Sequence, residues 1–111
     1  MTRGHVVPLR DEDDGVDRRH LEAYLDGEGR LHIDGHDLGP GTAPGSDDGE
    51  YEWFRTTAAV DLARLTALLG AYHGETILAV LARKYMGKRS YELERILRES
   101  DIPQGLRVWS G

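Results

Sequence analysis

Apolar and polar residues alternate between residues 20 and 38, which is the pattern of a β-hairpin. The apolar positions are Leu21, Ala23, Leu25, Leu31 and Ile33. Opposed residues of an antiparallel ladder point to the same face, so Leu25 should oppose Leu31 and Ala23 should oppose Ile33. Residues 27–29 then form a three-residue turn in which Gly29 takes the left-handed conformation.

The pattern after this hairpin predicts one further strand, then helices, then a short last strand. The stretch EYEWFRT (50–56) is rich in aromatic residues, with Tyr51 and Trp53 on one face and Phe54 on the other. Leucine and isoleucine at helical spacing predict helices over residues 58–69 and 75–86. A third helix should start at Ser90 as its N-cap and end before Pro103. Leu106 and Val108 alternate in the last strand.

This order of elements predicts an α+β fold with two layers. A three-strand antiparallel meander and a C-terminal strand form the sheet, and about three helices pack on one of its faces. Residues 39–49 are rich in glycine and proline and predict a loop. Residues 1–19 show no period and include the charged run DEDDGVDRR, which predicts a disordered N-terminal tail. We therefore expect a single domain over residues 20–111.

Composition limits the classes of function. The chain has 111 residues and no cysteine, which excludes disulfides, a thiol nucleophile and a cysteine-ligated zinc site. We find neither an apolar run of membrane-spanning length nor a signal peptide, and we expect a cytoplasmic protein without membrane contact. Lysine and arginine number 14, mostly arginine, which is typical of a GC-rich bacterial genome.

The net charge of −6 is unevenly distributed, since residues 20–52 hold only Arg30 against nine acidic residues. This acidity argues against non-specific nucleic-acid binding by the whole domain. A dense acidic surface has two interpretations: a solvated face, or a docking surface for a basic protein. The partner-binding candidates are Glu22, Asp34, Asp37, Asp47, Asp48, Glu50, Glu52 and Trp53. Tyr24 and Tyr51 could add aromatic contacts there or lie in the core.

The stretch LHIDGHDLG (31–39) raises the alternative of a metal site. In the expected register His20 opposes His36, and Glu22 opposes Asp34 on the same face, a ligand set that suits Zn²⁺ or another divalent ion. The opposing interpretation is an ordinary polar sheet face. A bulge at Gly35 would also break the pairing that brings the two histidines together.

Other chemistry in the sequence is sparse, and we expect no catalytic residue and no cofactor. Ser46 in PGSDDG does not match the nucleophile elbow, and Asp47 and Asp48 lie in a glycine-rich loop with nothing to raise a pKa. A basic cluster after the second predicted helix leaves nucleic-acid binding as a third option, although such a cluster also suits a helix C-terminus. Its members are Arg83, Lys84, Lys88 and Arg89.

The stretches GHDLGPG (35–41), GEYEWFRT (49–56) and the closing SYELERILRESDIP…WSG carry a resemblance over roughly residues 20–111. Together they resemble a group of small uncharacterised proteins from high-GC Gram-positive bacteria, the actinobacteria. The resemblance implies no catalytic residue. Small α+β immunity proteins have a similar build, and we expect a non-enzymatic domain that binds a basic protein. The sequence leaves the oligomeric state open.

Overall fold

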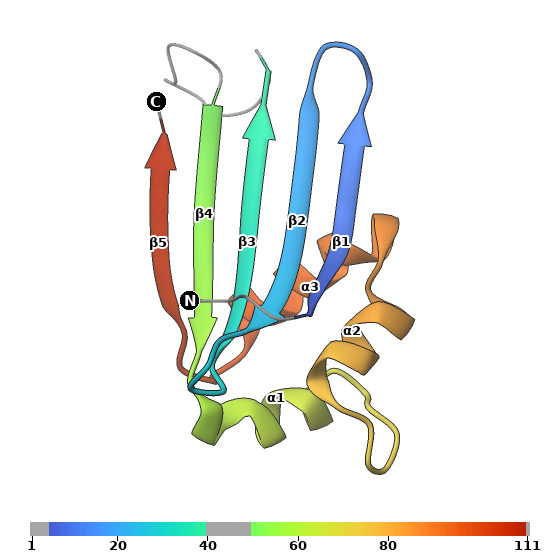
Figure 1. The fold of residues 1–111 in the computed structure, drawn as a ribbon, viewed down its shortest axis with the longest axis vertical. Helices are drawn as coiled ribbons and strands as arrows, with labels where there is room; N and C mark the ends of the chain where they lie inside the picture. The colour runs from blue at the N-terminus through green and yellow to red at the C-terminus, as the bar shows by residue number, and fades with distance from the viewer. Residues whose placement is uncertain (1–4, 40–49, 111) are drawn as a thin grey trace.

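The computed structural model of the chain describes residues 5–39 and 50–110 (Figure 1). The strands are β1 (Val6–Asp13), β2 (Arg18–Leu25), β3 (Leu31–Leu38), β4 (Glu50–Thr57) and β5 (Gly105–Ser110). The helices are η1 (Ala59–Asp61), α1 (Leu62–Leu68), α2 (Ile77–Lys84), η2 (Gly87–Arg89) and α3 (Ser90–Glu99), where η marks a 3₁₀ turn.

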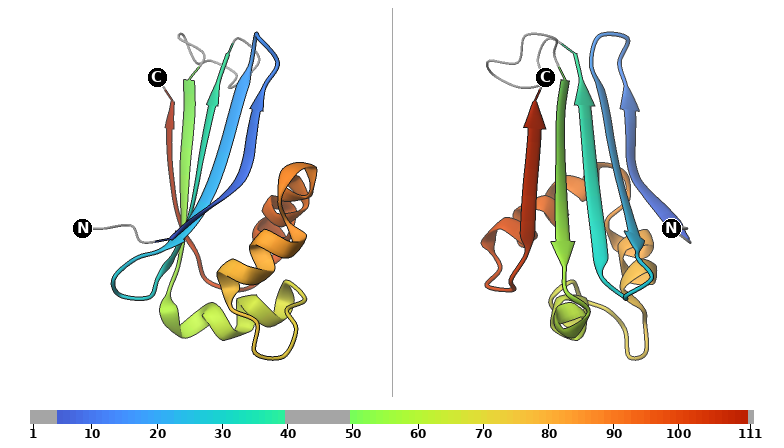
Figure 2. Two further views of the ribbon diagram at one scale, coloured as in Figure 1. Left: turned by 45° about the vertical axis from the view of Figure 1, so that its right-hand side comes forward. Right: turned by 60° about the vertical axis from the view of Figure 1, so that its left-hand side comes forward.

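The five strands form one antiparallel sheet in the order β1-β2-β3-β4-β5. All helices follow β4 in the chain and pack on one face of this sheet, as both views of Figure 2 show. This arrangement confirms the predicted α+β class with helices on one face. We call the helix-facing side the inner face and the opposite side the outer face.

The predicted disordered tail over residues 1–19 is wrong for its described part, because β1 pairs with β2 along its length. A register shift between Pro8 and Arg10 lets Leu9 and Arg10 both turn inward, and Leu9 is 1% exposed. Arg10 ends the apolar pattern after only Val7 and Leu9, so the sequence shows too short an alternation for a strand. The charged run after it forms the end of β1 and the turn into β2.

The register of the β2–β3 hairpin is confirmed. Leu25 opposes Leu31 and Ala23 opposes Ile33, and the backbone of Asp26 pairs with that of Arg30 around the predicted turn. Gly29 has φ +79°, the left-handed conformation that glycine adopts without steric cost. The pairing continues past Gly35 without a bulge, and the indole of Trp53 on β4 fills the space that a side chain would take.

The helices are shorter than predicted but lie where the periodicity indicates. Thr76 caps α2 by accepting a hydrogen bond from the amide of Ala79. Ser90 is not an N-cap as predicted; it is the first residue of α3, and its hydroxyl donates to the carbonyl oxygen of Gly87 at 2.5 Å. Among the described residues, we find no helix that is both long and apolar enough to cross a membrane.

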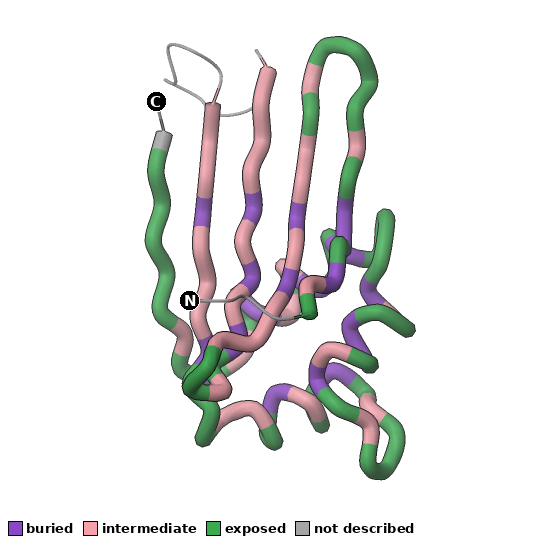
Figure 3. The backbone as a smooth tube through the Cα atoms, in the orientation of Figure 1, coloured by how far each residue is buried: buried purple, intermediate pink, exposed green. Residues whose placement is uncertain are grey.

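The hydrophobic core lies between the helices and only one half of the sheet's inner face (Figure 3). Fully buried leucines, isoleucine and valine from both layers form its centre: Leu9, Leu21, Leu31, Ile33, Leu65, Leu69, Val80, Leu81 and Leu93. The strand ends near the β1–β2 turn extend beyond the helices (Figure 1). The described helices therefore cover none of the outer face and only part of the inner face.

Candidate functional site

The outer face of the sheet gathers histidines and carboxylates from three neighbouring strands. Alternate residues of β2, β3 and β4 point outward, because the residues between them, many of them buried, lie on the helix-facing side. Their register forms four outward rows across β2, β3 and β4: Arg18–Leu38–Glu50, His20–His36–Glu52, Glu22–Asp34–Phe54 and Tyr24–His32–Thr56. The two pairs predicted from the sequence, His20 with His36 and Glu22 with Asp34, are therefore directly opposed.

His36 contacts carboxylates of β4, and these contacts were not predicted. Its Nε2 atom lies 2.9 Å from Glu50 Oε1 and 3.6 Å from Glu52 Oε1. The ligand atoms of these three residues all lie within 4.8 Å of one another, and in the described part of the chain this is the one such group of three or more. The group has His36 in common with the predicted metal set, but Glu50 and Glu52 replace the other members.

His20 belongs to a separate pair on β2. Its Nε2 atom lies 2.7 Å from Glu22 Oε1, and its Nδ1 atom lies 3.9 Å from Asp11 on β1. Glu22 follows His20 by two residues on one strand, so their side chains lie on the same face. His20 and His36 are thus neighbours in register that bind different carboxylates.

The third outward histidine stabilises the hairpin end. His32 Nε2 lies 2.8 Å from Asp26 Oδ2, and its ring stacks on Tyr24 with centroids 4.8 Å apart. Arg30 donates to the same carboxylate through its backbone amide and Nε. The hydrogen bond with His32, followed by those from Arg30, holds the pKa of Asp26 well below its ordinary value. Asp26 therefore anchors the turn as a carboxylate.

The predicted partner-binding residues do not all lie on this face. Glu22, Asp34, Glu50 and Glu52 share the outer face, whereas Asp37 opposes Tyr51 on the inner face. Trp53 is 9% exposed and packs in the core on the inner face, so its prediction as a contact beside these carboxylates is wrong. Alternation along β4 places Trp53 and Glu52 on opposite faces of the sheet. The sequence alone could not decide which of these faces packs against the helices. Asp47 and Asp48 lie outside the described residues.

An aromatic and a basic residue of β5 lie beside the group of His36, Glu50 and Glu52. The sequence analysis did not single them out. Arg107 opposes Phe54, with its guanidinium 5.1 Å from the ring centroid. Trp109 opposes Glu52 and is 50% exposed. These residues line a shallow groove of about 540 Å³. The predicted alternation of Leu106 and Val108 already implied that Arg107 and Trp109 point to the other face.

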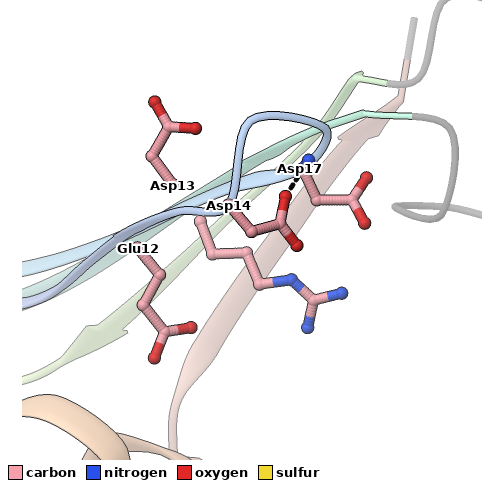
Figure 4. A pocket seen from close by; sticks show the side chains of 5 residues that line it. Glu12, Asp13, Asp14 and Asp17 are labelled. Atoms are coloured by element: carbon pink, nitrogen blue, oxygen red, sulfur yellow. Dashed lines mark hydrogen bonds between the residues drawn. The ribbon is translucent and has the colours of Figure 1, made fainter.

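A second acidic region lies at the β1–β2 turn (Figure 4). Its pocket of about 480 Å³ is lined by Glu12, Asp13, Asp14, Asp17 and Arg19. Asp14 Oδ1 accepts hydrogen bonds from the amides of Val16 and Asp17, and these bonds lower the pKa of its carboxyl group. Asp13 likewise accepts from the amide of Gly15. Two of these carboxylates therefore hold the turn, which explains the acidic run without a ligand.

The basic cluster behind the nucleic-acid option is partly engaged within the protein. Arg83 donates to both oxygens of Glu75 at 2.7–2.8 Å and lies 3.9 Å from the ring centroid of Tyr72. The hydrogen bonds from Arg83 lower the pKa of Glu75 to about 2. Arg83 thus fixes the connection between α1 and α2, and it is less available to a phosphate backbone than the sequence indicated.

Comparison with models of known protein families, with curated proteins and with solved structures finds no match for this chain. The resemblance to small actinobacterial proteins therefore stays a prediction. What the surface can do follows from its own residues: carboxylates in rows, each histidine beside a carboxylate, and an aromatic margin on β5.

Proposed function

We propose that the chain is a non-enzymatic protein-binding domain that docks a basic protein partner on its outer sheet face, in the manner of an immunity or inhibitor protein. The observation that carries this proposal is the grouping of Glu22, Asp34, Glu50 and Glu52 on a face that no described helix covers. An acidic, uncovered surface attracts a basic partner and speeds its association.

The charge balance of this face supports the proposal. Among the described residues of β2 to β5, the four outward carboxylates share the face with two arginines, Arg18 and Arg107, so acidic groups are in excess. The histidines of this face contact some of its carboxylates. Glu50 and Glu52, however, share one imidazole, that of His36. Partner arginines can replace that imidazole with bidentate contacts, which are stronger. Trp109 and Phe54 add aromatic area at the margin of the face.

Capture from a lysate of the source organism at low salt tests this proposal with charge-reversed variants. The immobilised wild-type protein should retain a basic protein at a fixed stoichiometry and release it in a salt step, because exposed charge pairs are screened by salt. Glu50→Lys/Glu52→Lys should weaken retention by at least about tenfold, since like charges across an interface cost several kcal/mol.

The matched control carries the same charge change on the helical layer. Glu92 and Glu99 are exposed on α3, and Glu92→Lys/Glu99→Lys should retain the partner as the wild type does. Equal loss in both double variants would indicate a response to net charge alone. Equal retention by the Glu50→Lys/Glu52→Lys protein would contradict docking on the outer face.

A second candidate function, divalent-cation binding, has its own supporting observation in the group His36, Glu50 and Glu52. Ligand atoms around a tetrahedral ion with bonds of about 2.0–2.1 Å lie roughly 3.3 Å apart. The separations of 2.9 and 3.6 Å from His36 Nε2 bracket that value. Three protein ligands would leave a fourth position to water, as in metal sites that act on substrates.

Calorimetric titration with Zn²⁺ separates this candidate from the set predicted by sequence. His36→Ala should abolish binding, whereas His20→Ala should leave it unchanged if the β4 carboxylates supply the other ligands. Loss of binding in both variants would instead support the set formed by His20, Glu22, Asp34 and His36. Binding that persists in His36→Ala would exclude either site.

A further inference from the structure

The inner face holds a small pocket at the edge of the sheet, between β4, β5 and α3. Its volume is about 190 Å³. Inward residues of the two strands and two residues one turn apart on α3 line it: Tyr51, Trp53, Arg55, Leu106, Val108, Glu94 and Arg98. Leu106 and Val108 are 55% and 51% exposed although they point to the helix-facing side. The helices therefore leave this part of the inner face open.

The lining combines aromatic and aliphatic side chains with two guanidinium groups, those of Arg55 and Arg98. Arg55 Nη1 donates to Gln104 Oε1 at 3.0 Å, and its guanidinium lies 5.8 Å from the ring centroid of Trp53. The Nε atom of Arg55 is buried and has no hydrogen-bond partner. A buried donor without an acceptor is costly, and a negative charge beside the Arg55 guanidinium would offset part of this cost.

The charges around the pocket favour an anion. Glu94 is its one carboxylate, and that group already binds the buried Arg10 at 2.6 Å. Arg98 forms no ion pair with any residue that the structure describes. Burial lowers the pKa of Arg55; Glu94 opposes this effect and Arg98 adds to it. Arginine keeps its charge under such shifts, so two cations share a site with too little counter-charge.

We propose that this pocket binds a small free carboxylate with a flat apolar body. The carboxylate accepts hydrogen bonds from the guanidinium groups of Arg55 and Arg98, a geometry for which arginine is suited. The apolar body lies against Tyr51, Trp53 and Val108. The volume is below the roughly 300–1,000 Å³ of pockets for drug-sized ligands, which restricts the ligand to about the size of one ring and a carboxylate. This site is independent of the docking function on the outer face.

Titration of the isotope-labelled protein with phenylacetate, followed by amide NMR shifts, tests the proposal. Saturable shifts should be confined to β4, β5 and the C-terminal half of α3. Phenylacetamide has the same shape without the charge, and it should bind at least about tenfold more weakly because the charge-assisted hydrogen bonds are lost. Acetate, which lacks the apolar body, should also bind more weakly.

Two arginines of α3 give a matched pair of variants. Arg98→Gln should weaken phenylacetate binding by about tenfold, whereas Arg95→Gln should not change it. Both side chains are exposed, but Arg95 contacts Glu92 and Glu99 and does not line the pocket. Equal affinity for phenylacetate and phenylacetamide, an unchanged affinity in Arg98→Gln, or no saturable shift up to about 10 mM phenylacetate would each overturn the proposal.

Discussion

The inner and outer faces of the sheet hold their charged residues in different ways. On the inner face Arg10 is 4% exposed, and it donates to Ser90 Oγ at 2.8 Å and to Glu94 at 2.6 Å. On the outer face the side chains of His20 and His36 are 36% and 39% exposed beside their carboxylates. Arg10 and Glu94 are thus fixed by contacts that the fold must keep, whereas the outer charges can exchange their partners.

This difference separates structural charge from charge that is available for binding. A buried ion pair is costly to break because the remaining charge stays without a partner. A surface pair contributes little to stability, since water replaces either partner at low cost. The outer face can therefore carry a binding function without being required for folding, and variants on the two faces should differ accordingly.

The largest expected effect is that of Glu94→Leu on the inner face. The variant leaves the Arg10 guanidinium, whose side chain is 3% exposed, without its carboxylate, and it should lose about 3–5 kcal/mol of unfolding free energy. The same substitution on the outer face, Glu22→Leu, should cost no more than about 1 kcal/mol. Urea denaturation measures both values.

A double variant sharpens this comparison. Arg10→Met/Glu94→Leu replaces both charges with apolar groups and should recover much of the stability that Glu94→Leu loses. Equal losses for Glu94→Leu and Glu22→Leu would mean that the two faces treat charge alike. A double variant less stable than Glu94→Leu would show that Arg10 stabilises the fold through other contacts, such as its stacking 3.6 Å over Tyr91.

The second largest effect should follow Gly35→Ala. A Cβ atom on Gly35 would lie 2.3 Å from Trp53 Cε2, so the indole must move within a packed core. Such overpacking costs about 1–3 kcal/mol. Asp34→Ala changes the neighbouring residue, which points to the outer face, and should cost less. A thermal melt followed by near-ultraviolet circular dichroism reports both stability and the indole environment. An unchanged tryptophan signal in Gly35→Ala would contradict this packing.

The sequence predicted most accurately the elements in which a local pattern decides the structure. The β2–β3 register followed from apolar residues on one face, because a shift of one residue would bury His32 and Asp34. β1 was missed because the burial of Arg10 depends on Ser90 and Glu94, 80 and 84 residues away. The contacts of His36 with the carboxylates of β4 were missed because no local pattern defines the register between β3 and β4.

The smallest expected effect distinguishes two aspartates by the pH dependence of stability. Burial raises the pKa of Asp37 on the inner face above its ordinary value of 3.8, and its Oδ1 atom is buried without a hydrogen-bond partner among the described residues. The native state then binds a proton more tightly than the unfolded state, so Asp37 lowers stability as the pH rises above about 4. Asp37→Asn should be more stable than the wild type at pH 7, by about 0.5 kcal/mol, and this advantage should disappear near pH 3.

Asp26, which binds His32 of the outer face, should show the opposite sign. Its pKa lies below 3.8, so its carboxylate stabilises the native state above that pH, and this contribution is lost as the pH falls through the lowered value. Asp26→Asn should therefore be less stable than the wild type at pH 7, and the deficit should shrink in acid. Urea midpoints at a series of pH values measure both variants. If both substitutions shift the urea midpoint in the same direction at pH 7, burial does not determine the effect of Asp37 on stability. The two faces would then not differ in how a carboxylate contributes to stability.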